Sequence, residues 1–334
     1  MKSDGIIVIL SYPDTVVRPA YWEYSSKIWP KIGIGHKDAV RAGHAALLLI
    51  QKNNPTIQYY DFGRYITTYG NGRVRSEETD PELHIPIKAE FNNNQLSNLE
   101  ELLLWLDQHP EKTHGNGRLI ASINDQIDFS KAKNYIDGLI QQKEIPYGAF
   151  IKNGTNCARF VTDTIINSTT KNSMKLKLKS SFLLTPSPIG NTIKGKTSST
   201  IYQVLNQQIS IYKNRSILKE YKLFFAKKLN TEVNLIGTEQ PDKKLFSLLN
   251  GTWLGGIGSG AWFSLSPTKI EGRYIISRFT DRGYKDFEGF FKSSTPGFNP
   301  EEPHEFVYPT NCSVAYIIQD TNIYVYRKVN SKPS

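Results

Sequence analysis

The chain has 334 residues, 39% of them hydrophobic and 12% aromatic, which is enough apolar material for a sizeable core and excludes a chain that is disordered throughout. It carries 41 Lys and Arg against 31 Asp and Glu, a net charge of +10, with the densest basic run at residues 171–179. That run lacks the interleaved aromatic residues of a nucleic-acid platform, so we interpret the charge as a solubility feature and expect no nucleic-acid partner.

The cysteine content and the N-terminus indicate the compartment. Cys157 and Cys312 are too few for a disulfide framework or a four-cysteine zinc site, so we expect reduced thiols, no metal and no cofactor. The apolar stretch at residues 6–10 is too short for a signal-peptide core, and no segment approaches the roughly 20 apolar residues of a membrane span. These features predict a cytoplasmic protein without a membrane span.

The first elements along the chain are strands. Residues 6–10 are rich in β-branched side chains, residues 43–50 are apolar on both faces, and residues 57–60 follow a turn signal, so the last two form a predicted hairpin. The pair Asn71-Gly72 suits a type I′ turn, and residues 83–89 predict another strand.

Helices dominate the next part. Leucines at helical spacing in residues 96–106 follow three asparagines, residues 92–94, that offer N-caps. Residues 117–123 predict a strand and residues 129–142 a helix. After a break at residues 146–148, Thr155 or Asn156 is positioned to cap a helix whose first turn contains Cys157.

The rest of the chain changes character. Residues 168–200, rich in Ser, Thr, Lys and Pro, predict an irregular linker, and residues 217–229 predict a helix. From residue 245 the chain is rich in Gly and aromatic residues, and its short apolar segments predict an antiparallel sheet or barrel. The G-x-G-x-x-A stretch at residues 256–261 precedes a strand rather than a helix, so we interpret it as turns rather than a dinucleotide site.

Cys157 is the candidate nucleophile. The partial positive charge of a helix N-terminus, together with a nearby imidazolium, favours the thiolate form of a cysteine, and the N–H groups of the first turn can receive an oxyanion. The alternative is a small buried residue in an amphipathic helix. Cys312 precedes a strand pattern, so we interpret it as a buried structural thiol.

The candidate base is His44, which opens a strand without another polar side chain, although such a histidine can also be a core residue. Asp61 lies on the partner strand of the hairpin and could hold the imidazole in one tautomer by accepting its second N–H. Gln58 is the alternative for that position.

Arginines near the Asn71-Gly72 turn are candidates for substrate binding. Arg73 and Arg75, with Tyr69, could present guanidinium groups to an acidic substrate, since these groups pair with carboxylates in a bidentate manner. The alternative is a hairpin with solvated arginines. Arg64 and Arg159 are open to the same two interpretations.

The order of these motifs resembles a known superfamily. Gly43-His44-Ala45, Tyr60-Asp61-Phe62 and Asn156-Cys157-Ala158 follow the order of the circularly permuted papain-like cysteine hydrolases, which include relatives of the NlpC/P60 amidases, lecithin:retinol acyltransferases and isopeptidases. The opening at residues 11–17 and the stretch at residues 258–263 also resemble an uncharacterised bacterial family.

The resemblance implies a fold and an activity. The fold would be α+β, with a permuted papain-like domain at residues 1–170, a linker and helical connector at 171–244, and a smaller β-rich domain at 245–334. The activity would be thiol-dependent attack by Cys157 on a peptide, amide or acyl-ester carbonyl, with His44 as the base and Asp61 as its orienting group. The alternative is a papain-like binding or scaffold protein that has lost activity. The substrate, the oligomeric state and the choice between hydrolysis and acyl transfer stay open.

Overall fold

A computed structural model describes residues 2–20, 22–23, 28, 31, 39–183, 185–213, 241, 244–245, 249–257, 259–293 and 295–329. The chain divides into two compact units. The first contains Met1–Gly63, Gly72–Ser76 and Leu83–Asn234, and the second contains Arg64–Asn71, Glu77–Glu82 and Leu235–Ser334. The predicted helix at 217–229 lies outside the described residues.

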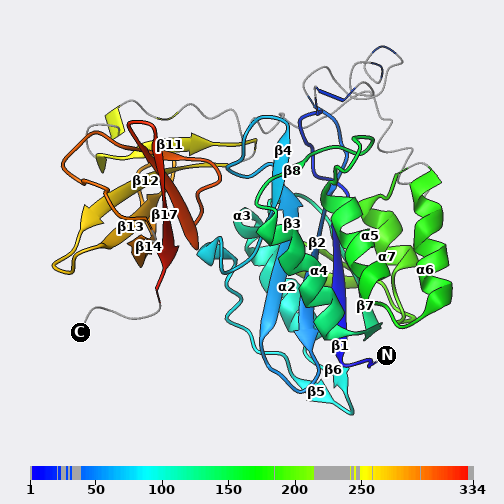
Figure 1. Cartoon of the computed structure of the whole chain (residues 1–334). Coiled ribbons are helices and arrows are strands. Elements are labelled where there is room, and N and C mark those ends of the chain that lie inside the picture. Colours follow the sequence, from blue (N-terminus) through cyan, green and yellow to red (C-terminus); the bar gives the residue numbers. More distant parts are fainter. Residues whose placement is uncertain are drawn as a thin grey trace. The chain divides into compact units, whose positions relative to one another are not determined.

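The first unit is built on an eight-stranded sheet whose central strands carry the predicted apolar segments (Figure 1). Each described neighbour pair from β10 to β4 is antiparallel. The spatial order is β10 (Gln208–Ile211), β9 (Tyr202–Leu205), β7 (Leu119–Ile127), β1 (Gly5–Tyr12), β2 (His44–Gln51), β3 (Ile57–Gly63), β4 (Asn71–Arg75) and β8 (Ile145–Pro146).

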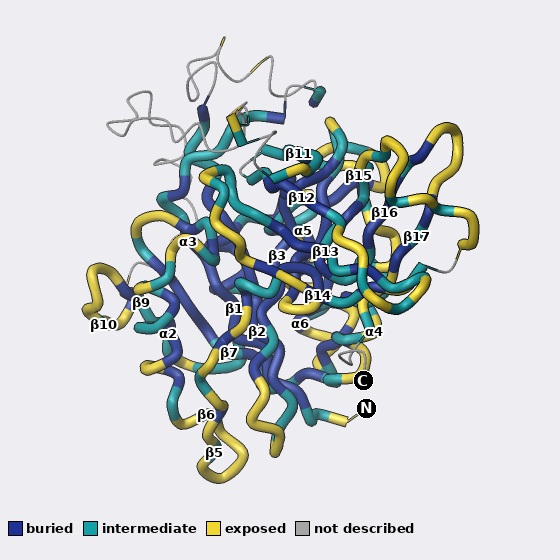
Figure 2. The backbone as a smooth tube through the Cα atoms, turned by 90° about the vertical axis from the view of Figure 1, so that its left-hand side faces the viewer, coloured by how far each residue is buried: buried dark blue, intermediate teal, exposed yellow. Residues whose placement is uncertain are grey.

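Helices cover both faces of this sheet. The leucines of α2 (Leu99–Gln108) pack on Ile6, Val8 and Leu10 of β1, whereas α4 (Phe129–Gln141), α5 (Cys157–Ser168) and α6 (Asn172–Lys179) pack on the opposite face with Ile7 and Ile9. Successive strand residues therefore face different helical layers, which is why the middle residues of β1 and β2 are apolar on both faces and both strands are buried over almost their whole length (Figure 2). Each fully buried leucine contributes about 1.5 to 3 kcal/mol.

Several elements differ from the sequence predictions. Asn93 and Asn94 have positive φ and form the turn between β5 (Phe91–Asn92) and β6 (Gln95–Leu96), so neither caps α2, whose N-cap is Asn98. The turn before β4 has positive φ at Gly70 rather than at Asn71 and Gly72. Gly72 instead allows close packing, since a Cβ there would lie 2.8 Å from the carbonyl oxygen of Gly63.

Two longer segments also differ. The predicted strand at 83–89 begins at the end of a short 3-10 helix (Pro81–Leu83) and then runs without strand pairing, although Leu83, Ile85 and Ala89 are buried against the core. The predicted irregular segment at 168–200 contains α6, the 3-10 helix Ser180–Leu183 and α7 (Pro188–Lys194). Ser187 caps α7 through a hydrogen bond from the N–H of Gly190 (3.1 Å), with Pro188 in the first turn.

The second unit is a strongly curved antiparallel sheet of seven strands, as the aromatic C-terminal pattern predicts. The spatial order is β11 (Thr252–Gly255), β12 (Gly260–Pro267), β13 (Arg273–Phe279), β14 (Lys285–Ser293), β17 (Asn322–Lys328), β16 (Val314–Gln319) and β15 (Glu305–Val307). The two edge strands meet, since the N–H of Phe306 donates to Thr252 Oγ1 (3.1 Å) and the N–H of Gly255 donates to the hydroxyl of Tyr308 (2.9 Å). The sheet is therefore nearly closed into a barrel, and the chain has an α+β fold with a separate β-rich C-terminal part.

Two short segments from the first half of the chain complete the second unit. Ile66 joins its hydrophobic core, and the N–H of Ile257 donates to the carbonyl of Arg64 (2.7 Å). The N–H of Cys312 donates to the carbonyl of Thr79 (3.1 Å). The β-rich unit thus depends on chain segments far from it in sequence.

No helix among the described residues has the length and apolar composition needed to cross a membrane.

Candidate functional site

His44 is the first residue of β2 and is buried, with 6% of its surface exposed. Gly43 precedes it with φ of +72°, and a Cβ at that glycine would lie 3.1 Å from the carbonyl oxygen of Tyr12. Tyr12 is the cross-strand partner of His44 on β1, and the two rings are stacked with their centroids 6.4 Å apart. The backbone turn at Gly43 and the stacked Tyr12 ring together fix the position of the imidazole.

Asp61 on β3 lies on the same side of the sheet as His44 and is completely buried. His44 Nε2 is 3.3 Å from Asp61 Oδ2, which also accepts a hydrogen bond from the hydroxyl of Tyr59 (3.0 Å). Gln58 has another partner, because its Oε1 accepts from the hydroxyl of Tyr60 (3.0 Å). Of the two candidates for the orienting position, the structure brings Asp61 to the imidazole.

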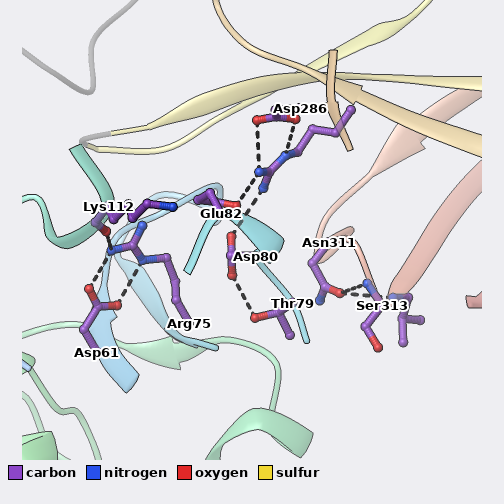
Figure 3. Close-up of polar contacts among 11 residues, drawn as sticks. Asp61, Arg75, Thr79, Asp80, Glu82, Lys112, Asp286, Asn311 and Ser313 are labelled. Atoms are coloured by element: carbon purple, nitrogen blue, oxygen red, sulfur yellow. Dashed lines mark hydrogen bonds and ion pairs between the residues drawn. The ribbon is translucent and has the colours of Figure 1, made fainter. Parts of the chain in front are cut away.

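Arg75 on β4 is the cross-strand partner of Asp61. Its Nε donates to Oδ1 (3.0 Å) and its Nη2 to Oδ2 (2.6 Å), and Nη2 also donates to the carbonyl oxygen of Lys112 (3.0 Å), as Figure 3 shows. Burial raises the pKa of Asp61, but the charge of Arg75 and the hydrogen bonds from His44 and Arg75 outweigh it and hold this pKa well below its ordinary range. Asp61 is therefore an anion.

Cys157 begins α5, as predicted, and is partly exposed. Asn156 is the N-cap, and its Oδ1 accepts from the N–H of Arg159 (2.9 Å). The first intrahelical hydrogen bond is donated by Phe160 to the carbonyl of Asn156 (2.9 Å). The thiol therefore lies at the positive end of the helix dipole, beside the N–H groups that precede this first bond.

The thiol of Cys157 lies close enough to the imidazole of His44 to influence its pKa. Burial lowers the pKa of His44, but the hydrogen bonds to Asp61 and Cys157 and the charges of these two groups outweigh it and raise the pKa to about 9. Cys157 begins a helix that packs on the face of the sheet opposite α2, and His44 is the first residue of β2. The thiol therefore approaches the imidazole at the end of the sheet where β2 begins. The structure thus brings Cys157, His44 and Asp61 together.

The opening motif at residues 11–17 forms part of the frame around His44. Asp14 accepts two side-chain hydrogen bonds from Arg118, from Nε (2.9 Å) and Nη2 (2.8 Å), and also forms an ion pair with Arg41. The N–H of Gly43 donates to the carbonyl of Thr15 (3.0 Å). This loop therefore holds the backbone that leads into β2.

The predicted substrate-binding residues do not form one exposed group. Arg75 is 2% exposed and fully engaged with Asp61 and Lys112, so it is neither a free substrate ligand nor a solvated hairpin residue. Arg73 is also buried, at 5% exposure, whereas Tyr69 is 75% exposed and belongs to the second unit. Substrate binding by Arg73 and Tyr69 stays a prediction.

Two other arginines from the sequence analysis also have internal contacts. Arg64 is 6% exposed. Arg159 donates through Nη1 to the carbonyl of Ala149 (3.2 Å) and lies over the ring of Phe182, 5.4 Å from its centroid.

Sequence reasoning missed the partners of Asp61, namely Tyr59 and Arg75. One signal was available, because a carboxylate in an apolar, buried strand requires a charged or hydrogen-bonding partner. The register of β3 against β4 then selects Arg75, but that register depends on a turn that was predicted two residues too late.

The chain is similar to two families and to a solved structure. Residues 7–174 match the family described as type VI secretion system effector TseH-like, and residues 251–329 match the DUF6695 C-terminal domain. The crystal structure of the type VI secretion system effector TseH matches with 17% sequence identity and a TM-score of 0.39, covering 64% of this chain and 100% of that chain. No curated protein matches the chain. Because the first match spans just over half of the residues, the chain belongs to the TseH-like family of type VI secretion system effectors.

Proposed function

We propose that the chain is a thiol-dependent hydrolase or acyltransferase of the papain-like class, with Cys157 as nucleophile, His44 as general base and acid, and Asp61 as the group that orients His44. One observation carries the proposal: a thiol at a helix N-terminus lies near an imidazole whose Nε2 faces a buried carboxylate. Each group of a Cys–His–acid site thereby has its partner.

The geometry supports a two-step reaction. Since Nε2 of His44 faces Asp61, Nδ1 remains for the thiol, and because the pKa of His44 is raised to about 9, the imidazole has taken the thiol proton before the sulfur attacks the carbonyl carbon. The N–H groups of Cys157 and Ala158 at the start of α5 receive the oxyanion. The imidazolium then protonates the departing amine or alkoxide, leaving a thioester on Cys157. Water or another nucleophile, deprotonated by His44, attacks the thioester and releases the acyl group.

The substrate class follows from this chemistry. A thioester-forming site acts on a peptide, amide or acyl-ester carbonyl, which is also what the permuted papain-like order of the motifs implies. The family description further supports a role as an effector of a type VI secretion system. The expected cytoplasmic location stays a prediction.

The reactivity of Cys157 tests the proposal without a known substrate. The full chain is treated with iodoacetamide at pH 7, and the labelling rates of Cys157 and Cys312 are followed separately by mass spectrometry of their peptides. We expect Cys157 to be labelled at least about 100 times faster, because only a thiolate displaces iodide. His44→Ala is expected to slow the labelling of Cys157 at least tenfold and to leave Cys312 unchanged.

Equal and slow labelling of both thiols in the folded protein would contradict the proposal and favour the inactive binding or scaffold protein. Fast labelling of Cys157 that does not depend on His44 would remove the histidine from the mechanism.

A further inference from the structure

We infer that Arg75 is a positioning residue of the thiol site: its bidentate ion pair fixes the carboxylate of Asp61 and balances its charge, so that His44 can pass between its neutral and cationic forms. The inference rests on the proposed function and adds a fourth member to the Cys157, His44 and Asp61 group.

The first argument is charge balance. Asp61 is completely buried and Arg75 is 2% exposed, so neither charge is compensated by water. With Arg75 present, the group is neutral overall both before proton transfer and after it, when His44 is a cation and Cys157 an anion. Without Arg75 the group would carry a net negative charge in both states, and the buried carboxylate would take up a proton as the pH falls.

The second argument is geometry. The guanidinium occupies both carboxylate oxygens, through Nε to Oδ1 (3.0 Å) and Nη2 to Oδ2 (2.6 Å), which fixes the plane of the carboxylate. Nη2 is itself held by the carbonyl of Lys112 (3.0 Å) in α3 (Pro110–Thr113). The oxygen that faces the imidazole is therefore fixed from β4 and from α3. A lysine could supply the charge but not the two parallel hydrogen bonds.

The third argument is that Arg75 is the one permanent cation among the described contacts of Asp61, since His44 gives up its proton during the reaction. Tyr59 donates a neutral hydrogen bond, and burial raises the pKa of Tyr12 well above its ordinary value, so this phenol stays neutral. The titratable and charged groups that act on the His44–Asp61 pair come from five elements: Tyr12 on β1, Tyr59 on β3, Arg75 on β4, Asp107 on α2 through Tyr12, and Cys157 on α5.

The test is the pH profile of Cys157 labelling by iodoacetamide between pH 4 and pH 9 in the full chain. We expect Arg75→Gln to move the acid limb of the profile upward by about 1 to 3 pH units, the range by which a neighbouring opposite charge shifts a carboxyl group. Labelling on that limb then falls about tenfold for each unit. Arg75→Lys is expected to restore the position of the acid limb but not the plateau rate. Lysine keeps the positive charge but cannot form the two parallel hydrogen bonds of the guanidinium.

Two further variants separate a positioning role from a structural one. In Asp61→Asn/Arg75→Gln both charges are removed together and the group is neutral again, so we expect the acid limb to stay close to its wild-type position rather than to move upward as in Arg75→Gln. Arg278→Lys is the matched control: Arg278 is also buried, and it pairs with both oxygens of Asp286 through Nε and Nη2 (both 3.0 Å) in the second unit. It should lose stability and keep the wild-type profile. Circular dichroism establishes that each variant is folded.

The outcomes distinguish this inference from the proposed function. If wild-type Cys157 is labelled no faster than Cys312, the proposed function fails and the inference fails with it. If the wild type is fast and folded Arg75→Gln keeps the same profile, only the inference is overturned. If Arg75→Gln does not fold, the inference is overturned by a wild-type plateau in Arg75→Lys, or by an acid limb in the double variant that lies well above the wild-type position.

Discussion

The two cysteines of the chain lie in different units, and their surroundings have one feature in common. Each has a cationic side chain nearby, His44 for Cys157 and Arg278 for Cys312. Cys157 is partly exposed at a helix N-terminus, whereas Cys312 is completely buried in the core of the β-rich unit and follows no helix.

Burial and the neighbouring carboxylates both oppose the ionisation of Cys312. Burial raises the pKa of this thiol well above its ordinary value, and the positive charge of Arg278 does not compensate for it. Arg278 is already bound by acidic side chains, with Nη2 donating to Glu82 (2.5 Å) and Nε to Asp286 (3.0 Å). Figure 3 labels these two acidic residues and the neighbouring Asp80. A neighbouring cation therefore favours a thiolate only where burial and nearby carboxylates do not outweigh it.

Unfolding should abolish the difference in reactivity between Cys157 and Cys312, and this is the largest effect that we expect. In 8 M urea both thiols are solvated, so we expect the ratio of their iodoacetamide labelling rates to fall from at least about 100 in the native protein to within about threefold. Peptide mass spectrometry of samples quenched at pH 7 measures both rates. A ratio that persists in urea would mean that local sequence, rather than the folded site, sets the reactivity of Cys157.

Weakening the β-rich unit should change only one of the two thiols. Arg278→Gln leaves buried Asp80 and its acidic neighbours without their cation, which we expect to cost about 3 to 5 kcal/mol of the stability of this unit. Cys312 should then become accessible through unfolding of the unit, with labelling at least 100 times faster than in the wild type. Urea unfolding and labelling of Cys312 check this result, and an unchanged midpoint would contradict the assigned role of Arg278.

The sequence predicted those parts of the site that depend on local structure. The apolar strand behind His44, the hairpin that carries Asp61, and the cap followed by Cys157 are all patterns within about ten residues, and the structure has them at the expected positions. The seven-stranded C-terminal sheet was likewise indicated by its short aromatic segments, except that β15, with three residues, was too short to produce a pattern.

What the sequence did not predict depends on contacts between distant segments. Arg75 looks like a surface arginine in a hairpin until the register of β3 and β4 places it opposite Asp61. The polar composition of residues 168–200 hides two short helices. The first, α6, buries only Met174 and Leu178, and the buried residues of α7 include the polar Asn191 and Thr192. Such helices are stabilised by packing on the first unit rather than by their own propensity.

A smaller effect should come from pH. Because the pKa of His44 is raised to about 9 in the folded chain, its contribution to stability is fully present below its unfolded value near 6.5 and is lost as the pH rises through 9. The raised pKa corresponds to about 3 kcal/mol of stability. We expect this loss between pH 6 and pH 9.5 in urea unfolding of the wild type, and not in His44→Gln.

Cys312 provides the control for that experiment. It is completely buried and its raised pKa keeps it neutral across this range, so Cys312→Ala should keep the wild-type pH dependence even though it leaves a small cavity. An identical pH dependence in the wild type and His44→Gln would mean that the imidazole has an ordinary pKa in the folded chain.

The smallest effect concerns the helix start, the feature that Cys312 lacks. Asn156→Ala removes the side-chain bond to the N–H of Arg159 (2.9 Å) and should cost about 1 kcal/mol of stability in the first unit. Asn156→Asp keeps the cap and therefore the stability, but it places a carboxylate beside Cys157 and should slow its labelling severalfold, since a neighbouring anion disfavours a thiolate. Urea unfolding and iodoacetamide labelling of both variants separate the two contributions of Asn156. If Asn156→Asp labels as fast as the wild type, the electrostatic field at the start of α5 does not control the reactivity of this thiol, and the contrast with Cys312 reduces to exposure and His44 alone.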